Sequence, residues 1–320
     1  MAASSGSPLL PLDERGSIVT LGSFDGVHRG HQQIVAEVTN RAGLTGRRSV
    51  LVTFHPHPLR IIRPAVAPKL LTTPAEKKAI LAESGLEYVV FLEFTQALQQ
   101  YSARRFVEEI LLGRLGMKQL VIGHDHAFGK GREGTSDAMR ALGEELHFDV
   151  EVIAGVKQGT NLVSSSHVRR SLEEGDVISA AGALGRPYSL QGLVVEGMRK
   201  GRELGFPTAN IRIDAPEKLL PRPGIYAVRG LVDGASLPGL LHLGPRPTFS
   251  GYAPSVELHL LDWSGDLYGR SIRVDFCAYL REVERFESVD ALVAQMHADA
   301  ARGRKVFAGG EPSACVPPVG

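Results

Sequence analysis

The chain has 320 residues, of which 43% are hydrophobic and 22% charged, and its formal net charge is +1. These values are typical of a globular protein of about two domains. The balanced charge excludes a global field that would attract nucleic acid or a membrane surface, so any anion binding must be local. With only two cysteines, Cys277 and Cys315, a disulfide framework and a cysteine zinc site are excluded.

The two ends of the chain carry no targeting pattern. No apolar run approaches the roughly 18 residues of a membrane span, and the first residues lack the basic and apolar regions of a signal peptide. We therefore expect a cytoplasmic protein without membrane contact, with a short disordered lead and a frayed tail.

In the first half of the chain, strand patterns alternate with helical patterns. The predicted strands cover residues 17–24, 49–54, 88–94, 119–123 and 148–155, and the predicted helices cover residues 30–42, 73–84, 102–116 and 136–146. Most of these strands are apolar from end to end. This pattern indicates an α/β fold with a parallel sheet covered by helices on both faces.

The pattern changes near residue 185. Short strands broken by Gly, Pro, Asp and Asn turns follow, which predicts a small barrel or a sandwich. Residues 288–307 return to helical spacing, so a C-terminal helix is expected after the strands. We place the domain boundary between residues 183 and 188.

A glycine-rich stretch, LGSFDGVHRGH (21–31), lies where the first strand gives way to the first helix. A helix N-terminus at the carboxyl end of a parallel strand offers free N–H groups and a positive dipole, which suit phosphate. The glycines allow a tight turn and a close backbone approach, and His28 and His31 can donate hydrogen bonds to phosphoryl oxygens. The stretch therefore predicts half of a phosphate site.

Two further segments of the first half carry histidines, acids or glycines. In TFHPHP (53–58), His55 and His57 form an H-x-H pair, which is a weak metal signal without a third nearby ligand. A literal G-x-G-x-x-G at 129–134 does not follow its strand directly, and no acid lies at the right place after it, so we discount a dinucleotide fingerprint. The P-loop pattern is absent from the sequence.

Two segments nearer the C-terminus combine hydroxyl, amide and basic groups. VSSSHVRRSL (163–172) reads as a helix cap followed by arginines, a combination that suits phosphate. GFPTAN (205–210) places the Thr208 hydroxyl and the Asn210 amide after a proline turn, and both are oxygen donors suited to Mg²⁺.

Glu257 lies in a predicted strand in which Val256, Leu258 and Leu260 share one face. If this apolar face packs outward against the C-terminal helix, Glu257 points into the barrel, where a carboxylate needs a task or a partner. Periodicity alone leaves open a solvated strand glutamate.

Together these motifs resemble the bacterial bifunctional riboflavin kinase/FAD synthetase family. The 22–31 stretch resembles the H-x-G-H signature of nucleotidyltransferases in its extended form, and VIGHDHAFGKGREGT (121–135) resembles another segment of the same module. The kinase part is carried by G-x-P-T-A-N at 205–210, followed in the family's order by segments at 224–228, 243–249 and 256–262. Ser166, Glu196 and His242 depart from the residues usual in the family.

The resemblance implies the architecture and the reaction. It implies a Rossmann-like FMN adenylyltransferase domain over residues 15–183 and a riboflavin kinase domain, a small antiparallel β-barrel with a C-terminal helix, over residues 184–307. Riboflavin would be phosphorylated to FMN, and FMN adenylylated to FAD with release of pyrophosphate. The implied partners are riboflavin, FMN and ATP with Mg²⁺, without nucleic acid, and the chain would be a monomer or a weak oligomer.

The resemblance also implies roles for individual residues. Glu257 would be the general base of the kinase, and His28 and His31 would stabilise the phosphates during adenylyl transfer. The expected ATP and phosphate contacts are Gly22, Phe24, Asp25, Gly30, Ser164, Ser165, Arg169, Gly205 and Pro207; the expected flavin contacts are Asp125, Phe128 and Gly129; the expected Mg²⁺ ligands are Thr208 and Asn210.

Two alternatives remain open at this point. The first is an adenylyl- or cytidylyltransferase for another small phosphate, with the barrel as a regulatory module. The second is a non-catalytic flavin or RNA binder, since small barrels bind both. RNA binding predicts basic stripes with aromatic residues, whereas the barrel region mixes charges of both signs and holds few aromatics.

Overall fold

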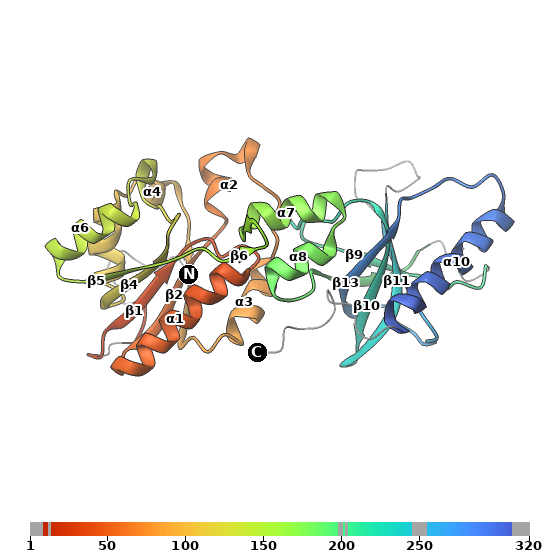
Figure 1. Cartoon of the computed structure of the whole chain (residues 1–320), viewed down its shortest axis with the longest axis horizontal. Coiled ribbons are helices and arrows are strands. Elements are labelled where there is room, and N and C mark those ends of the chain that lie inside the picture. Colours follow the sequence, from red (N-terminus) through yellow and green to blue (C-terminus); the bar gives the residue numbers. More distant parts are fainter. Residues whose placement is uncertain (1–8, 12–13, 198–200, 202–203, 245–254, 309–320) are drawn as a thin grey trace. The chain divides into compact units, whose positions relative to one another are not determined.

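The computed structural model describes residues 9–11, 14–197, 201, 204–244 and 255–308, and they form two compact units that divide between Val163 and Ser164 (Figure 1). This division comes before the predicted domain boundary, because α7 (Ser165–Glu174) and α8 (Val177–Leu184) belong to the second unit. Most of the expected lead, the expected tail, and residues 245–249 of the expected kinase segment lie outside the described residues. Among the described residues, no helix is both long and apolar enough to cross a membrane.

The first unit is built on a five-stranded parallel sheet in the order β3-β2-β1-β4-β5. Its strands are β1 (Ser17–Leu21), β2 (Arg48–His55), β3 (Tyr88–Glu93), β4 (Met117–Gly123) and β5 (Asp149–Ile153). Every residue of the central strand β1 is buried. The predicted parallel sheet is therefore confirmed.

Helices cover both faces of this sheet (Figure 1). Its larger helices are α1 (Arg29–Thr45), α3 (Pro74–Ala82), α5 (Ala103–Phe106) with the π-helical η2 (Val107–Leu112), and α6 (Ser136–Leu146). Ile18 packs with Val38 of α1, whereas the next residue, Val19, packs with Leu111 of η2. Because successive strand residues point to opposite faces, these two contacts place α1 and η2 on opposite sides.

Several short elements of the first unit were not predicted. They are α2 (Pro58–Ile62), the 3-10 turns η1 (Pro64–Val66) and η3 (Lys130–Arg132), α4 (Gln96–Gln99), and the hairpin of β6 (Lys157–Gln158) and β7 (Asn161–Leu162). Each is too short to show a helical or strand period in the sequence.

The strand order creates a switch point between β1 and β4. The chain moves from β1 outward to β2 and β3, and then returns to the other side of β1 to form β4 and β5. Ligands of open α/β sheets bind at such a point, beyond the carboxyl ends of the strands. The segments that follow β1 and β4 are thus the expected binding region of this unit.

The second unit contains a closed, fully antiparallel barrel in the order β10-β11-β12-β9-β8-β13. Its strands are β8 (Ser189–Val195), β9 (Ala209–Arg212), β10 (Gly224–Val232), β11 (Ala235–Gly244), β12 (Ser255–Leu260) and β13 (Ser271–Arg281). Of the two predicted architectures, barrel and sandwich, the barrel is therefore correct.

The helix α10 (Val289–Ala308) packs on the outside of this barrel. Its Ala300 joins a cluster with Leu240 and Leu261. A Cβ added at Gly303 would lie 2.7 Å from Leu240 Cδ2, so the helix approaches the barrel wall closely at this glycine.

The condition under which Glu257 would point into the barrel, that the Val256 face packs against this helix, is not met. Val256, Leu258 and Leu260 are all buried, while the outer cluster with α10 contains Leu261, which shares the alternate face with Glu257. A small barrel fills its interior with side chains, and the more apolar face of β12 takes that place. Glu257 therefore lies on the outer face of the barrel.

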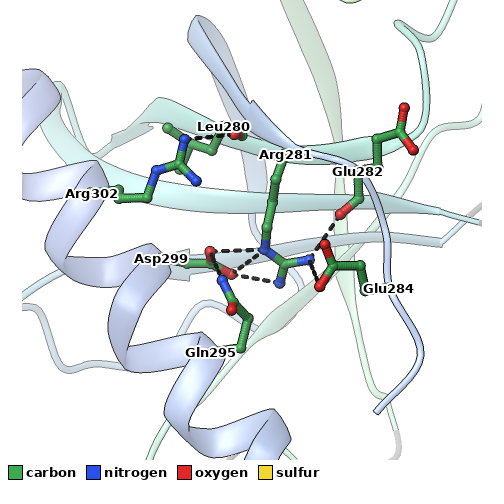
Figure 2. A network of polar contacts seen from close by, with 7 residues as sticks. All are labelled: Leu280, Arg281, Glu282, Glu284, Gln295, Asp299 and Arg302. Atoms are coloured by element: carbon green, nitrogen blue, oxygen red, sulfur yellow. Dashed lines mark hydrogen bonds and ion pairs between the residues drawn. The ribbon is translucent and has the colours of Figure 1, made fainter.

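A buried ion pair attaches α10 to β13. Figure 2 shows Arg281 between Asp299 and Glu284, and its Nη2 donates to Asp299 Oδ2 at 2.7 Å. Gln295 Nε2 also donates to Asp299, at 2.9 Å. The two charged side chains are only 13% and 5% exposed, so each needs the other to compensate for its lost hydration.

Candidate functional site

His28 and His31 come together at the first turn of α1. His28 is the N-cap residue of the helix, and its Nδ1 accepts a hydrogen bond from the backbone N–H of His31 at 3.4 Å. Their rings stack with centroids 3.6 Å apart, and the Phe24 ring lies 4.8 Å from that of His31. Since α1 follows the central strand β1, the pair stands at the switch point, where a helix N-terminus favours an anion.

The loop that leads to this pair has an unusual backbone. Phe24 and Val27 have φ values of +44° and +41°, a region that side chains, and β-branched ones above all, rarely adopt. Each such residue costs on the order of 1–3 kcal/mol and persists only where the surroundings fix it. The loop therefore needs strong contacts to keep its shape.

Asp25 supplies some of these contacts from inside the protein. It is 1% exposed, and its Oδ1 accepts hydrogen bonds from the backbone N–H groups of Leu71 and Thr72, at 3.0 and 3.1 Å. The Thr72 hydroxyl accepts in turn from the N–H of Gly26, at 3.1 Å. This placement gives Asp25 the task of holding the loop, and its predicted part in ATP binding stays a prediction.

Lys77 of α3 supports the same loop. It is 7% exposed, and its Nζ donates to the Ser23 carbonyl oxygen at 2.6 Å and to Thr53 Oγ1 at 3.4 Å. Burial lowers the pKa of Lys77, and the nearby Asp25 carboxylate acts in the opposite direction. Lys77 was not among the residues predicted from the sequence, because a lysine on a helix is exposed in most proteins.

A small pocket opens beside this loop. Its lining residues are Phe54, His55, His57, Leu70, Thr72, Pro74, Lys77 and Phe91. His57 also caps α2, because its Nδ1 accepts from the N–H of Leu59 at 3.2 Å. No group of three His, Cys, Asp or Glu side chains in the described part of the chain could hold a metal ion, so the H-x-H pair still lacks a third ligand.

The second segment at this edge follows β4, the neighbour of β1. Phe128 packs against Phe106 with ring centroids 5.6 Å apart, and a Cβ at Gly129 would lie 2.7 Å from the backbone nitrogen of Ala103. Both residues therefore shape the segment by packing. Asp125 is exposed, which leaves its carboxylate accessible to a ligand.

His126 lies in the same segment and was also missed by the sequence analysis. Burial lowers its pKa to about 4, so the ring is neutral at pH 7. Its Nε2 is buried and has no hydrogen-bond partner among the described residues. A neutral imidazole at this place contributes shape and a polar atom instead of charge.

The remaining small residues of the first motif lie against its rings. A Cβ at Gly22 would come within 3.2 Å of the Phe24 ring, and one at Gly30 within 3.3 Å of the His28 ring. Besides their predicted role in the close approach of phosphate, these two glycines therefore leave room for the aromatic side chains.

The predicted triphosphate residues Ser164, Ser165 and Arg169 belong to the second unit. Ser164 is the N-cap of α7, and its Oγ accepts from the backbone N–H of His167 at 3.2 Å. The cap predicted from the sequence is thus present. The part of these three residues in ATP binding stays a prediction.

Strand register brings the predicted kinase residues together in the barrel. Glu257 of β12 lies directly opposite Asn210 of β9 and, on its other side, opposite His242 of β11. Directly opposed residues point to the same face of a sheet, so these three side chains share the outer face of the barrel. Burial lowers the pKa of His242, and the Glu257 carboxylate opposes this shift.

The G-x-P-T-A-N segment is shaped by glycines that the sequence analysis did not single out. A Cβ at Gly197 would lie 2.0 Å from Asn210 Nδ2, and one at Gly201 would lie 3.2 Å from Thr208 Oγ1. The signal in the sequence is the G-x-x-x-G spacing that precedes the motif. Any larger residue at Gly197 would displace the Asn210 amide.

Gly205 and Pro207 form an exposed turn before Thr208. The carbonyl oxygen of Pro207 lies 2.9 Å from His259 Nδ1 and accepts a hydrogen bond from it. Thr208 and Asn210 offer hydroxyl and amide oxygens, which are hard oxygen ligands of the kind that Mg²⁺ takes together with substrate phosphates. The donor set therefore fits a magnesium–nucleotide complex.

Comparisons with known proteins identify a family for each half of the chain. The family model for FAD synthetase matches residues 10–167, and the model for riboflavin kinase matches residues 184–307. The bifunctional riboflavin kinase/FMN adenylyltransferase of Pseudomonas fluorescens is 40% identical over 297 residues, which cover 92% of this chain and 94% of that protein. The protein of the same name from Escherichia coli strain K12 is 36% identical over 295 residues, with the same coverage.

A solved structure extends the similarity to the fold. The crystal structure of a protein from Streptococcus pneumoniae described as a macrolide-efflux protein is 26% identical and has a TM-score of 0.83, covering 93% of this chain and 97% of that one. The sequence matches span nearly the whole length of the relatives, so this chain belongs to the bifunctional riboflavin kinase/FMN adenylyltransferase family.

Proposed function

We infer that the chain makes FAD from riboflavin in two steps, and we propose which residues carry each step. The chain is a transferase: its kinase activity passes the γ-phosphoryl group of ATP to riboflavin, giving FMN and ADP. Its adenylyltransferase activity joins FMN to the adenylyl group of ATP, giving FAD and pyrophosphate. The observation that carries this conclusion is that both family models match in one chain, over residues 10–167 and 184–307.

In the kinase step, Glu257 is the general base. Its carboxylate takes the proton of the riboflavin 5′-hydroxyl as that oxygen attacks the γ-phosphorus, and the leaving group is ADP. The register that sets Glu257 opposite Asn210 supports this assignment, because it brings a base and a phosphate-side ligand to one face. Phosphoryl transfer depends mainly on such positioning and on charge neutralisation.

Thr208 and Asn210 would hold Mg²⁺ together with the ATP phosphates. When bound, the ion neutralises charge on the phosphate oxygens. Gly205 and Pro207 shape the turn that presents Thr208. The fit of the oxygen donors and the room that Gly197 leaves for the Asn210 amide support this proposal.

In the adenylyl-transfer step, a phosphate oxygen of FMN attacks the α-phosphorus of ATP, and pyrophosphate leaves. His28 and His31 donate hydrogen bonds to the phosphates as charge moves towards the leaving group. Ser164, Ser165 and Arg169 hold the triphosphate, while Asp125, with Phe128 and Gly129 as shaping residues, binds the flavin. The stacked pair at the N-terminus of α1 supports the role of the histidines.

The chain acts in the cytoplasm under this proposal, because both steps consume ATP. Riboflavin, FMN and ATP are its partners, and neither step needs a second copy of the chain.

One incubation tests the two-step reaction. The protein is mixed with riboflavin, ATP and Mg²⁺, and the products are separated by chromatography at successive times. FMN should appear first and FAD later, and omission of riboflavin should abolish both. If FMN is not converted with ATP but another phosphate substrate is, or if CTP replaces ATP, the chain is a different nucleotidyltransferase with a regulatory barrel.

A further inference from the structure

We propose that Lys77 is a positioning residue for adenylyl transfer: it holds the backbone of the loop at residues 23–27 and thereby keeps His28 and His31 in place. The proposal rests on the role given above to the two histidines. Lys77 lies outside the motifs by which the sequence was interpreted, and it belongs to α3, a different element from the one that carries the pair.

The position of Lys77 on α3 is fixed at the start of the helix. Thr73 caps the helix, and a reciprocal pair of hydrogen bonds joins Thr73 and Glu76, with Glu76 Oε2 accepting from the Thr73 N–H at 2.8 Å. Pro74 occupies the first turn, where its fixed φ suits a helix. The Lys77 side chain therefore leaves a rigid first turn and reaches the loop with little conformational freedom.

The contacts of Lys77 converge on one carbonyl group. The Ser23 carbonyl oxygen accepts from Lys77 Nζ at 2.6 Å and from Thr53 Oγ1 at 3.1 Å, and Lys77 Nζ lies 3.4 Å from the same Thr53 oxygen. Thr53 is fully buried and Lys77 nearly so. A buried ammonium group is costly unless it is hydrogen-bonded and faces opposite charge, and the loop supplies both, through Ser23 and Asp25.

The loop needs this support because of its backbone. Phe24 and Val27 keep positive φ angles, which persist only where the surroundings over-determine them. Asp25 and Thr72 hold the loop from one side of the α3 start, and Lys77 with Thr53 holds it at Ser23. Val27 directly precedes the N-cap residue His28, so a relaxation of the loop displaces the histidine pair.

Lys77 also lines the pocket beside the loop. Its ammonium group could therefore touch a phosphate of ATP directly, and it could alternatively serve only the stability of the first unit. These two roles predict different kinetics from a positioning role. A group that binds ATP changes KM for ATP, whereas a group that orients the histidines changes kcat.

The test compares Lys77→Met with Lys78→Met, the exposed neighbour on the same helix. Wild-type protein is first shown to make FAD from supplied FMN; if it makes none, the proposed function fails, and the role of Lys77 is then not at issue. With Lys77→Met, kcat for FAD formation should fall about 10- to 100-fold, while KM for ATP stays within about threefold. Lys78→Met should leave both constants unchanged, and riboflavin kinase activity of the same chain is the internal control.

A second variant keeps the proposal testable if Lys77→Met fails to fold. Thr53→Val keeps the shape of the side chain but removes the hydroxyl that donates to Ser23, and it carries no charge that could have bound ATP. It should also lower kcat for FAD formation, by a smaller factor than Lys77→Met, and again without a change in KM for ATP. The proposal is overturned if Thr53→Val leaves kcat unchanged, if folded Lys77→Met retains full kcat, or if its KM for ATP rises more than its kcat falls.

Discussion

The two units hold their candidate catalytic residues by different physical means. In the first unit, His28 and His31 depend on a strained loop, which is held by the buried side chains of Thr53 and Lys77 and by a backbone N–H group at residue 71. In the barrel, Glu257, Asn210 and His242 face the same way because backbone pairing sets the register of three strands. A loop site is therefore sensitive to the loss of any one buried partner, whereas a register site tolerates the loss of neighbours and depends on the reacting side chain itself.

The largest effect is expected from Glu257→Gln, which keeps the size and register of the side chain and removes the base. Riboflavin phosphorylation should slow by about 10²–10⁴-fold, and FAD formation from supplied FMN should continue at the wild-type rate. Both rates are measured on the same preparation. Glu287→Gln, at an exposed glutamate of the second unit, is the control, and a joint loss of both activities would contradict separate sites.

The reverse pattern is expected from His31→Ala. Loss of a donor to the phosphates in the transition state should slow FAD formation by about 10²–10³-fold, while riboflavin kinase activity is preserved. Gln33→Ala, at an exposed position of the same helix, is the matched control. If His31→Ala still makes FAD at the normal rate, the phosphate role of the first motif is wrong.

Asp299→Ala should affect the stability of the second unit more than either catalytic activity. It leaves Arg281 charged and buried without its buried partner, and the exposed Glu284 is 4.0 Å away, so the free energy of unfolding should fall by about 3–5 kcal/mol. The chain has one tryptophan, Trp263, which lies in the second unit, so its fluorescence in a denaturant titration follows that unit.

Two control variants test whether the unpaired charge causes this loss of stability. Arg304→Ala breaks an exposed pair between the same helix and Asp262 and should cost less than about 1 kcal/mol. The double variant Arg281→Met/Asp299→Leu should recover much of the lost stability, since it removes both buried charges. If the double variant is as unstable as Asp299→Ala, the loss of stability comes from the missing ion pair and not from an unpaired buried charge.

Much of the architecture could be predicted because local patterns in the sequence determine it. Apolar strands alternating with helical spacing predicted the parallel sheet, and short strands between turns predicted the barrel. The candidate residues His28, His31, Thr208 and Asn210 stood out because unusual residue types were concentrated within a few positions. Lys77 and His126 did not, since a lysine on a helix and a histidine in a loop are exposed in most proteins.

Two features follow from neighbours along the chain alone: which residues alternate on each strand, and where the glycine-rich turn meets a helix. Two others depend on contacts across the folded chain: Asp25 faces inward to the start of α3, and Glu257 lies on the face of the barrel that α10 shares. A period of two distinguishes the two faces of a strand but does not say which one another element covers. That choice is made by packing between segments far apart in the sequence, where the apolar face fills the barrel interior.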